Sequence, residues 1–512
     1  MKFEQTFDYI VVGAGSAGCT IANRLSEDPN VSVLLLEVGA ADTNSAIHKT
    51  DIQSMTSLWG SKLDWGYSTE QEQYLNKRQI AIAQGKVLGG SSSLNAMMYV
   101  RGNRRDYDSW SRLGNEGWSY EEVLPYFKKS EDYEGGASEF HGVGGPLSVI
   151  DYRNPAPVSQ AFVNAAIELG YKGNNWDFNG SQQEDGAGFY QSTRTSNNQR
   201  CSTAVAFLNP ILERSNFTVQ TKALVTRLLI SKNQVVGVEY SQDGTLHQVK
   251  AESEVIVSCG SFDSPRLLML SGIGDANHLK SLNIPVVLDL PGVGLNLQDH
   301  LLLGVGYKCK QEQPSPNLLA EAGLFTRSGN NLDDSPDLQF FFGPVQFLEP
   351  EYLWDGPGFT FAPILIAPQS RGTVTLRSNN PEDLAIIHTN YLEKDADIKV
   401  LVKGIQLSRE LVHTHAFDDF RGEELAPGAD ITNESGLREY IRKVASTVWH
   451  PVGTCKMGRD RNAVVDPQLK VHGIAGLRVA DASIMPTITR GNTNAATIMI
   501  GEKAADMIIA SR

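Results

Sequence analysis

The sequence has 512 residues, long enough for two or three domain-sized units with a large core. It carries 45 Lys and Arg against 59 Asp and Glu, and the resulting net charge of −14 argues against a nucleic acid or an anionic membrane as a partner. No apolar run approaches the roughly 18 residues of a membrane span, and no signal-type segment precedes the first predicted strand, so we expect a cytoplasmic protein without a transmembrane segment.

The five cysteines are scattered along the chain without C-x-x-C spacing. A disulfide framework or a zinc site is therefore not expected. His413 and His415 are two residues apart and do not share a helix face, so they do not indicate a metal site either. We expect no metal.

The first predicted unit is a strand, a helix and a second strand at residues 7–37. An apolar strand at residues 9–12 leads into the glycines of a G-x-G-x-x-G motif, Gly13, Gly15 and Gly18, where a helical pattern with one apolar face begins. Gly13 allows a tight turn, Gly15 lets the backbone approach a pyrophosphate, and Gly18 lets the helix pack closely on the strand. Glu37 ends the second strand about 20 residues after the last glycine, where an acid would meet an adenosine ribose hydroxyl.

The motif predicts dinucleotide binding, but it does not separate NAD from FAD. The helix N-terminus would point free N–H groups at the phosphates. The choice between the two dinucleotides depends on the rest of the chain.

A second glycine-rich segment, residues 85–103, reads GKVLGGSSSLNAMMYVRGN. A flexible linker is the alternative interpretation, but linkers are not followed at once by an apolar, helix-compatible run. Small residues followed by the start of a helix suit a backbone that is pressed against a flat ligand. We expect Asn95 to be a polar contact of that ligand.

The middle of the chain alternates between predicted helices, strands and loops. An apolar strand near residue 257 leads into a Gly-Ser turn and a helix, which indicates a second approach to the same nucleotide. The predicted helices lie at 106–129, 158–169, 396–413, 435–444 and 492–509, and the predicted strands at 225–240 (a hairpin), 255–258, 338–342, 359–366, 372–377 and 477–481. Residues 311–446 thus predict an α+β segment with an antiparallel sheet, a suitable wall for a substrate pocket.

The motifs together resemble those of the glucose–methanol–choline (GMC) oxidoreductase family over essentially the whole chain. They are VGAGSAG (12–18), GKVLGGSSSLN (85–95), GSFDSPRLLMLSGIG (260–274), PGVGLNLQDH (291–300), WHPVGTCKMG (449–458) and GLRVADASIMPTITRGNTNAATIMIGEKAADMI (476–508). The resemblance implies FAD as cofactor and the oxidation of a primary alcohol to an aldehyde, with hydride transfer to flavin N5.

The resemblance also implies an α/β fold with a Rossmann-like FAD-binding domain and an α+β substrate domain built on an antiparallel sheet. We expect the FAD-binding domain at residues 1–155, 200–310 and 445–512, and the substrate-binding domain at residues 156–199 and 311–444.

By the same motif matching, Glu37 and the motif glycines should hold the ADP half of FAD. Gly90, Asn95 and Ala96 should lie against the flavin. The expected cofactor-binding residues are Gly13, Gly15, Ser16, Ala17, Gly18, Glu37, Gly85, Leu88, Gly90, Ser91, Asn95, Ala96, Met97, Val225 near the adenine, Asp481 toward the ribityl and phosphate region, Ala482, Asn492 and Asn494. Some choline-oxidising members link a histidine covalently to the flavin at the position of Leu94, so we expect non-covalent FAD here.

Alcohol oxidation requires a base for the hydroxyl proton and a donor that holds the alkoxide. His450 occupies the family's catalytic histidine position, and an imidazole titrates near neutral pH. Asn492 matches a position that the family fills with histidine or asparagine. It also stands where the last helix should begin, and asparagine is a favoured helix N-cap. Both roles are compatible.

Two further residues, Glu321 and Trp449, are expected to bind substrate. Glu321 matches a glutamate that attracts the ammonium group in choline-oxidising relatives, although members that act on uncharged alcohols have similar segments. Trp449 and Val448 stand beside the base and bear on access of the electron acceptor, which is oxygen or a quinone-type carrier.

Two other hypotheses stay open at this point. A lyase or a photodecarboxylase could use the same FAD scaffold, although the pair His450 and Asn492 favours redox chemistry over photodecarboxylation. A non-catalytic flavoprotein that acts as a binding module is the third hypothesis.

Overall fold

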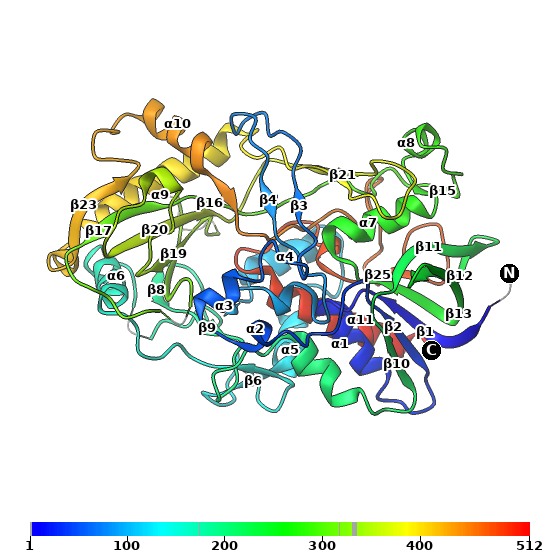
Figure 1. Ribbon diagram of the computed structural model, residues 1–512. Helices are drawn as coiled ribbons and strands as arrows, with labels where there is room; N and C mark the ends of the chain where they lie inside the picture. Colours follow the sequence, from blue (N-terminus) through cyan, green and yellow to red (C-terminus); the bar gives the residue numbers. More distant parts are fainter. Residues whose placement is uncertain (1–2, 174, 317, 330–334) are drawn as a thin grey trace.

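The computed structural model describes residues 3–173, 175–316, 318–329 and 335–512. It contains two large sheets in two adjoining lobes (Figure 1). The seven-stranded sheet lies in the lobe that holds both termini, and the eight-stranded sheet lies in the other. The predicted fold class, a Rossmann-like unit joined to an antiparallel α+β unit, is confirmed.

The seven-stranded sheet has five parallel strands and an antiparallel hairpin. Its strands are β1 (Gln5–Val12), β2 (Val33–Leu36), β10 (Phe217–Gln220), β11 (Leu224–Ser231), β12 (Gln234–Gln242), β13 (Thr245–Val257) and β25 (Leu477–Val479). The parallel order β10-β2-β1-β13-β25 places β1 in the centre. All of β2 and the second half of β1 are buried, as expected of parallel strands that are covered on both faces.

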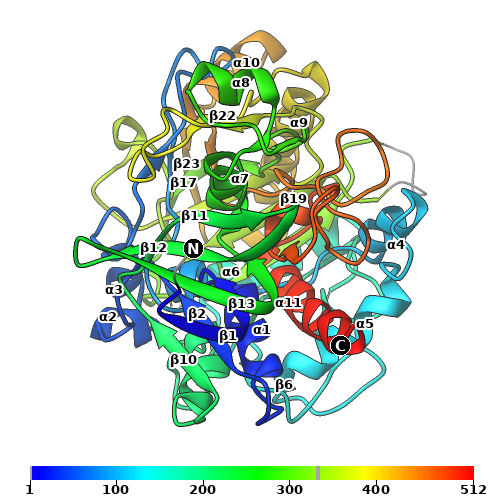
Figure 2. The ribbon, with the colours of Figure 1, turned by 90° about the vertical axis from the view of Figure 1, so that its right-hand side faces the viewer.

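Helix α1 (Ser16–Leu25) follows β1 and is covered in turn by α11 (Thr493–Ala510). The sequence predicts a single apolar face for α1, but every residue of this helix except Arg24 is buried. The reason is the close contact with α11, which Figure 2 shows running beside α1 and α5 (Tyr120–Ser130). A Cβ at Gly501 of α11 would lie only 2.9 Å from the carbonyl oxygen of Ala17.

The eight-stranded sheet is antiparallel throughout. Its strands are β8 (Gly186–Phe189), β16 (Leu301–Leu302), β17 (Val305–Cys309), β18 (Ala322–Thr326), β19 (Leu338–Gly343), β20 (Gly358–Leu365), β23 (Arg421–Ala426) and β24 (Ser446–Thr447). Helices α6 (Pro157–Glu168) and α9 (Asp395–Val412) pack on it. Stacked rings such as Phe162 and Phe342, 4.7 Å apart, fill the core between sheet and helices.

The remaining elements lie outside these two sheets. The helices are α2 (Ser45–His48), α3 (Ile52–Thr56), α4 (Arg104–Arg112), α7 (Gly260–Leu270), α8 (Ala276–Ser281) and α10 (Glu434–Val444). The short strands are β3 (Tyr67–Ser68), β4 (Ala81–Ile82), β5 (Met98–Tyr99), β6 (Glu131–Tyr133), β7 (Leu147–Val149), β9 (Gln191–Ser192), β14 (Ile273–Gly274), β15 (Leu288–Asp289), β21 (Thr373–Thr375) and β22 (Ile386–His388).

The predicted start of a helix after GGSSS is wrong. Gly90–Ser93 form one 3-10 turn, and the chain then enters strand β5. The hydroxyl groups of Ser92 and Ser93 donate to the carbonyls of Gly89 and Leu88, which offers the backbone an alternative to a helix. Met97 has a φ of +61°, which no α-helix accommodates.

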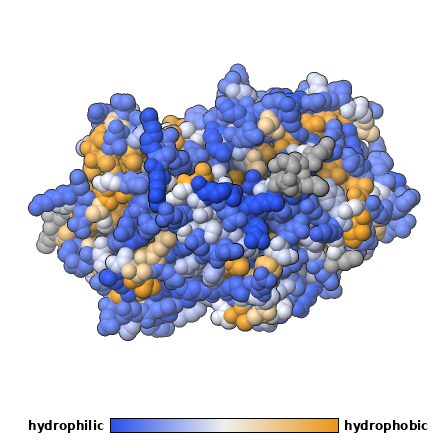
Figure 3. Space-filling model, turned by 180° about the vertical axis from the view of Figure 1, so that it is seen from behind, coloured by the Kyte–Doolittle hydropathy of each residue, from blue (hydrophilic) through white to orange (hydrophobic). Residues whose placement is uncertain are grey.

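The face of the molecule in Figure 3 is mostly hydrophilic, and its hydrophobic residues form separate patches. Within the described ranges, we find no helix both long and apolar enough to cross a membrane.

We predict that Gly18→Ala destabilises the protein by about 1–3 kcal/mol, because the new methyl group would overpack the contact between α1 and β1. A Cβ there would lie 1.9 Å from the carbonyl oxygen of Gly13. The measurement is the free energy of unfolding in urea. Gly329→Ala is the matched control, since no atom of the described residues lies within 4 Å of a Cβ at that position. Equal stability of the two variants would contradict this account.

Candidate functional site

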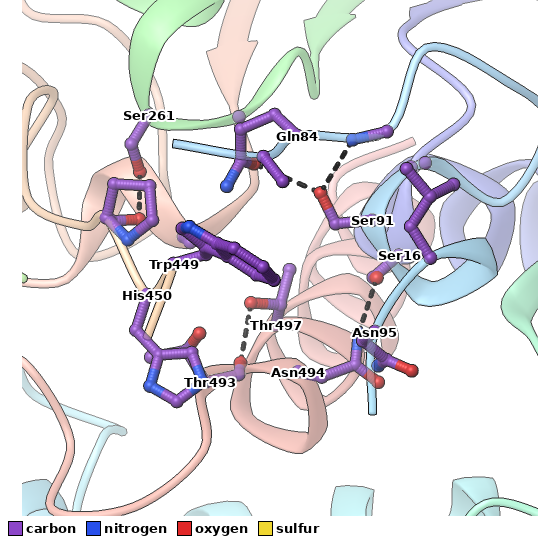
Figure 4. Close-up of a pocket in the computed structure, with 18 of the residues that line it drawn as sticks. Ser16, Gln84, Ser91, Asn95, Ser261, Trp449, His450, Thr493, Asn494 and Thr497 are labelled. Carbon is purple, nitrogen blue, oxygen red and sulfur yellow. Dashed lines mark hydrogen bonds between the residues drawn. The ribbon is translucent and has the colours of Figure 1, made fainter. Parts of the chain in front are cut away.

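A cavity of about 390 Å³ lies between the two sheets. Its lining combines residues of the glycine motif at the start of the chain with residues of the segment 446–451 and of the beginning of α11. Figure 4 shows the side chains of Ser16, Trp449, His450 and Asn494 arranged around one opening. Segments that are more than 400 residues apart in sequence therefore meet at a single site.

The glycine motif forms one wall of the cavity. Gly13 has a φ of +99°, which the tight turn after β1 requires. A Cβ at Gly90 would lie 2.7 Å from the Cα of Gly15, so the two glycine-rich segments touch backbone to backbone. A Cβ at Gly15 would meet only the carbonyl of Ser258, at 3.9 Å. The motif therefore leaves its backbone open to a ligand.

Two buried carboxylates, Glu37 and Asp481, line the cavity. Glu37 accepts hydrogen bonds from the N–H groups of Ala14 and Gly39, both at 2.8 Å. Burial raises the pKa of Glu37 to about 7, although these two N–H groups act in the opposite direction. Burial likewise raises the pKa of Asp481, whose oxygens accept from Ser264 Oγ and from the N–H of Gly260.

Most residues predicted from the sequence line this cavity. They are Gly13, Gly15, Ser16, Ala17, Glu37, Gly85, Gly90, Ser91, Asn95, Ala96, Met97, Val225, Trp449, His450, Asp481, Ala482, Asn492 and Asn494. Gly18, Leu88 and Glu321 are described by the structure but do not belong to the lining. Gly18 instead packs against Gly13, and Leu88 is buried in the core of the first lobe.

The lining fits an elongated anionic dinucleotide such as FAD. No side chain of the described residues caps the N-terminus of α1 or of α11, so both helix ends can offer N–H groups to a ligand. Asn494 Nδ2 donates to Ser16 Oγ at 2.7 Å and links the two helix ends. Asn492 stands at the predicted N-cap position, yet its buried Oδ1 has no hydrogen-bond partner within the described chain. This atom is free for a ligand.

His450 lines the cavity and forms a pair with His300. Their Nδ1 atoms are 3.0 Å apart, and the rings meet edge to face. Burial lowers the pKa of His450 to about 3. Burial also lowers the pKa of His300 well below its ordinary value, and a charge on His450 would lower it further. Both rings are therefore neutral near pH 7 and share one proton between the two Nδ1 atoms.

Asp299 holds this histidine pair in place. Its Oδ1 accepts from the N–H groups of His300 and His450, at 2.9 and 2.8 Å. Its Oδ2 accepts from the hydroxyl groups of Tyr391 and Thr447, both at 2.5 Å. Burial raises the pKa of Asp299 to about 6, against the opposing effect of these donors. One buried carboxylate thus fixes the backbone of both histidines.

The residue before His450 is strained. Trp449 has a φ of +62°, a conformation that costs a residue with a side chain roughly 1–2 kcal/mol. Its N–H donates to Thr447 Oγ1 at 2.7 Å, and its ring meets that of Trp59 at 4.6 Å. Such strain is retained where the surrounding contacts enforce it, and it concentrates at functional sites.

Sequence reasoning missed His300 and Asp299. Both stand in the PGVGLNLQDH motif, directly before β16. An Asp-His dipeptide in a motif that accompanies a candidate base is a signal that could have pointed to them. His300 lies 150 residues before His450 in the sequence, and nothing in the sequence indicated that the two side chains would meet.

Comparisons with known proteins show the family to which this chain belongs. Two family models, both described as GMC oxidoreductase, match residues 7–302 and 368–501. An alcohol dehydrogenase [acceptor] of Pseudomonas putida is 41% identical, over 98% of this chain and 96% of its own length. The mitochondrial choline dehydrogenase of Mus musculus is 42% identical, over 99% of this chain and 90% of its own length. The crystal structure of a pyridoxine 4-oxidase from Mesorbium loti superimposes with a TM-score of 0.91 at 32% identity, covering 98% of both chains.

The low pKa of His450 predicts an effect of pH on stability. Between the folded pKa of about 3 and the unfolded pKa of about 6.5, the unfolded chain binds a proton that the folded chain does not. Lowering the pH from 7 to 5 should therefore cost the wild type about 2 kcal/mol more than His450→Gln. The measurement is urea unfolding at both pH values with the same free FAD concentration. Parallel pH profiles would show that His450 is not held neutral.

Proposed function

The chain belongs to the GMC oxidoreductase family and is an FAD-dependent oxidoreductase of alcohols, and we propose that His450 is the base that accepts the hydroxyl proton of a primary alcohol. Bound FAD supplies the acceptor for the hydride that leaves the carbinol carbon. The observation that carries the proposal is that His450 lines the same cavity as the glycine motif.

The neutral histidine pair determines which nitrogen of His450 is basic. If the shared proton resides on Nδ1 of His450, its Nε2 has a free lone pair and can accept the proton of the alcohol. His300 must then carry its own proton on Nε2. Nδ1 of His300 faces His450, and its buried Nε2 makes no hydrogen bond among the described residues. The nearby carbonyl groups of Ile366 and Thr489 nevertheless raise the pKa of His300, which favours a proton on this ring. We therefore assign the base-competent tautomer to His450.

Asn492 is the second catalytic residue in this proposal. Its side chain lines the cavity and is not used as a helix cap, so the amide is available to hydrogen-bond the substrate oxygen. The N-terminus of α11 adds partial positive charge at the same place, which stabilises a developing alkoxide. In this proposal His450 removes the proton, and Asn492 stabilises the oxyanion.

The lining residues identified from the sequence are the proposed FAD site, with Glu37 and Val225 at the adenosine end. Binding would be non-covalent, because Leu94 offers no nucleophile to the flavin. Leu94 lines the cavity and packs with Ile47, Leu58 and Val87.

Two further assignments are part of the proposal. The electrons pass to oxygen or to a quinone-type carrier, and Val448 and Trp449 line the cavity beside the base. The described cysteines are all free, which suits a cytoplasmic location.

A lyase or a photodecarboxylase is the alternative that the sequence left open, and it finds no support. The two relatives reported above are dehydrogenases. In the proposed site, His450 and Asn492 line one cavity and would act as base and oxyanion donor, as alcohol oxidation requires.

We predict that His450→Gln slows flavin reduction by an alcohol at least about 100-fold, because the general base is removed. The measurement is the anaerobic loss of flavin absorbance in a stopped-flow instrument. FAD content should be unchanged, since His450 is not among the residues proposed to hold the nucleotide. His472→Gln is the matched control: His472 bonds the carbonyl of Gly458, outside the cavity. An unimpaired His450→Gln enzyme would exclude His450 as the base.

His300 acts through His450, and the two substitutions of His300 should differ. His300→Ala removes the acceptor for the Nδ1 proton of His450 and should slow flavin reduction about tenfold, roughly the loss of one neutral hydrogen bond. His300→Asn places an amide oxygen near the former Nδ1 and should recover part of the rate. The measurement is the pH profile of flavin reduction for all three proteins. Equal rates for the alanine and asparagine variants would refute the tautomer assignment.

A further inference from the structure

The eight-stranded sheet and its loops form the second wall of the cavity. Among the described residues, this wall consists of Leu302, Leu319, Ala320, Phe341, Gly343, Val345, Phe347, Thr360, Ala362, Ser446, Thr447 and Val448. Its side chains are aliphatic, aromatic or hydroxyl-bearing, and none of those named carries a charge. Thr360 Oγ1 already donates to the carbonyl of Val345, so its hydroxyl is not free to donate to a ligand.

Glu321 is the one carboxylate that the sequence suggests for this wall. Both of its oxygens accept hydrogen bonds from groups outside the cavity lining. Its Oε1 accepts from Tyr152 Oη at 2.5 Å, and its Oε2 accepts from the N–H of Ala156 at 3.0 Å, just before α6. The residue is 1% exposed and does not belong to the cavity lining. Glu321 therefore holds the start of α6 against the sheet and does not face a ligand.

The three tryptophans of the cavity, Trp59, Trp65 and Trp449, do not compensate for this missing charge. A tryptophan ring face can attract a cation. The ring of Trp65, however, already has two cationic neighbours: Lys86 Nζ lies 4.6 Å from its centroid, and the Arg266 guanidinium lies 5.9 Å from it. A third positive group beside these two would be repelled. Trp59 and Trp449 meet edge to face and donate their indole N–H groups to backbone carbonyls.

We propose that the substrate is an uncharged primary alcohol with an apolar carbon body that packs against this wall. The inference rests on the proposed function and narrows it. A quaternary ammonium alcohol such as choline would have to bury its charge against apolar side chains, and an uncompensated buried charge is costly. The 42% identity with a choline dehydrogenase therefore does not imply that choline is the substrate of this chain.

The test compares choline with 3,3-dimethylbutan-1-ol, in which a carbon atom replaces the nitrogen. The two alcohols have the same shape and differ only in charge. We expect the second-order rate constant of anaerobic flavin reduction to be at least about tenfold higher for the neutral alcohol, which corresponds to about 1.4 kcal/mol. A rate constant for choline that equals or exceeds that of the neutral alcohol would overturn the inference. If neither these two nor benzyl alcohol and octan-1-ol reduce the flavin, the proposed function itself fails.

Two variants locate the origin of the preference. Glu321→Gln should change the ratio of the two rate constants by less than about twofold, within the scatter of a distant substitution. A selective loss of choline turnover in this variant would place Glu321 beside the substrate and contradict the inference.

Val345→Asp introduces a carboxylate into the wall at a half-buried position. The ratio should shift toward choline by about tenfold, as an opposite charge close to the ammonium group predicts. Val345→Asn is the matched control, because it adds a polar group of the same size without charge and should not shift the ratio. An unchanged ratio in Val345→Asp would show that the substrate does not contact this wall.

Discussion

The contact between α1 and α11 is the constraint on which the site depends. Helix α1 can be covered by α11 only because Gly501 leaves room for the backbone of Ala17. Arg24 adds two hydrogen bonds to the buried carboxylate of Glu502, at 2.7 and 2.8 Å. With the two helices fixed in this way, their N-termini open onto the same cavity. The first and last parts of the chain therefore present their unpaired backbone N–H groups to a single ligand.

Burial gives the proposed base its protonation state, and a separate set of contacts gives it its position. His450 is neutral because partial burial at the cavity wall lowers its pKa, and it is oriented because His300 and Asp299 bind its side chain and its backbone. The strained backbone of Trp449 belongs to the same arrangement, since Thr447 holds both its N–H and the carboxylate of Asp299. A substitution at Asp299, which does not line the cavity, would thus act on the proposed base without touching the substrate.

The sequence predicted those features that depend on local pattern. The glycine motif, the hairpin at β11 and β12, and the helices α9, α10 and α11 follow from turn residues and apolar periodicity, and the structure confirms them. Features that depend on tertiary contacts were not predictable. The segment after Gly90 has apolar residues compatible with a helix, but serine hydroxyls bond its backbone and strand β9 pairs with it instead. The partners of His300 and Glu321 lie 150 and 169 residues away, and no local signal identifies them.

The position of α11 in the sequence has a consequence for biosynthesis. The ribosome completes β1 and the glycine motif several hundred residues before it makes α11, the partner of α1. Until then, the nascent polypeptide exposes the face of α1 that is buried in the finished fold. The contact between α1 and α11, and the cavity wall that the two helix ends share, can thus form only after translation has reached α11.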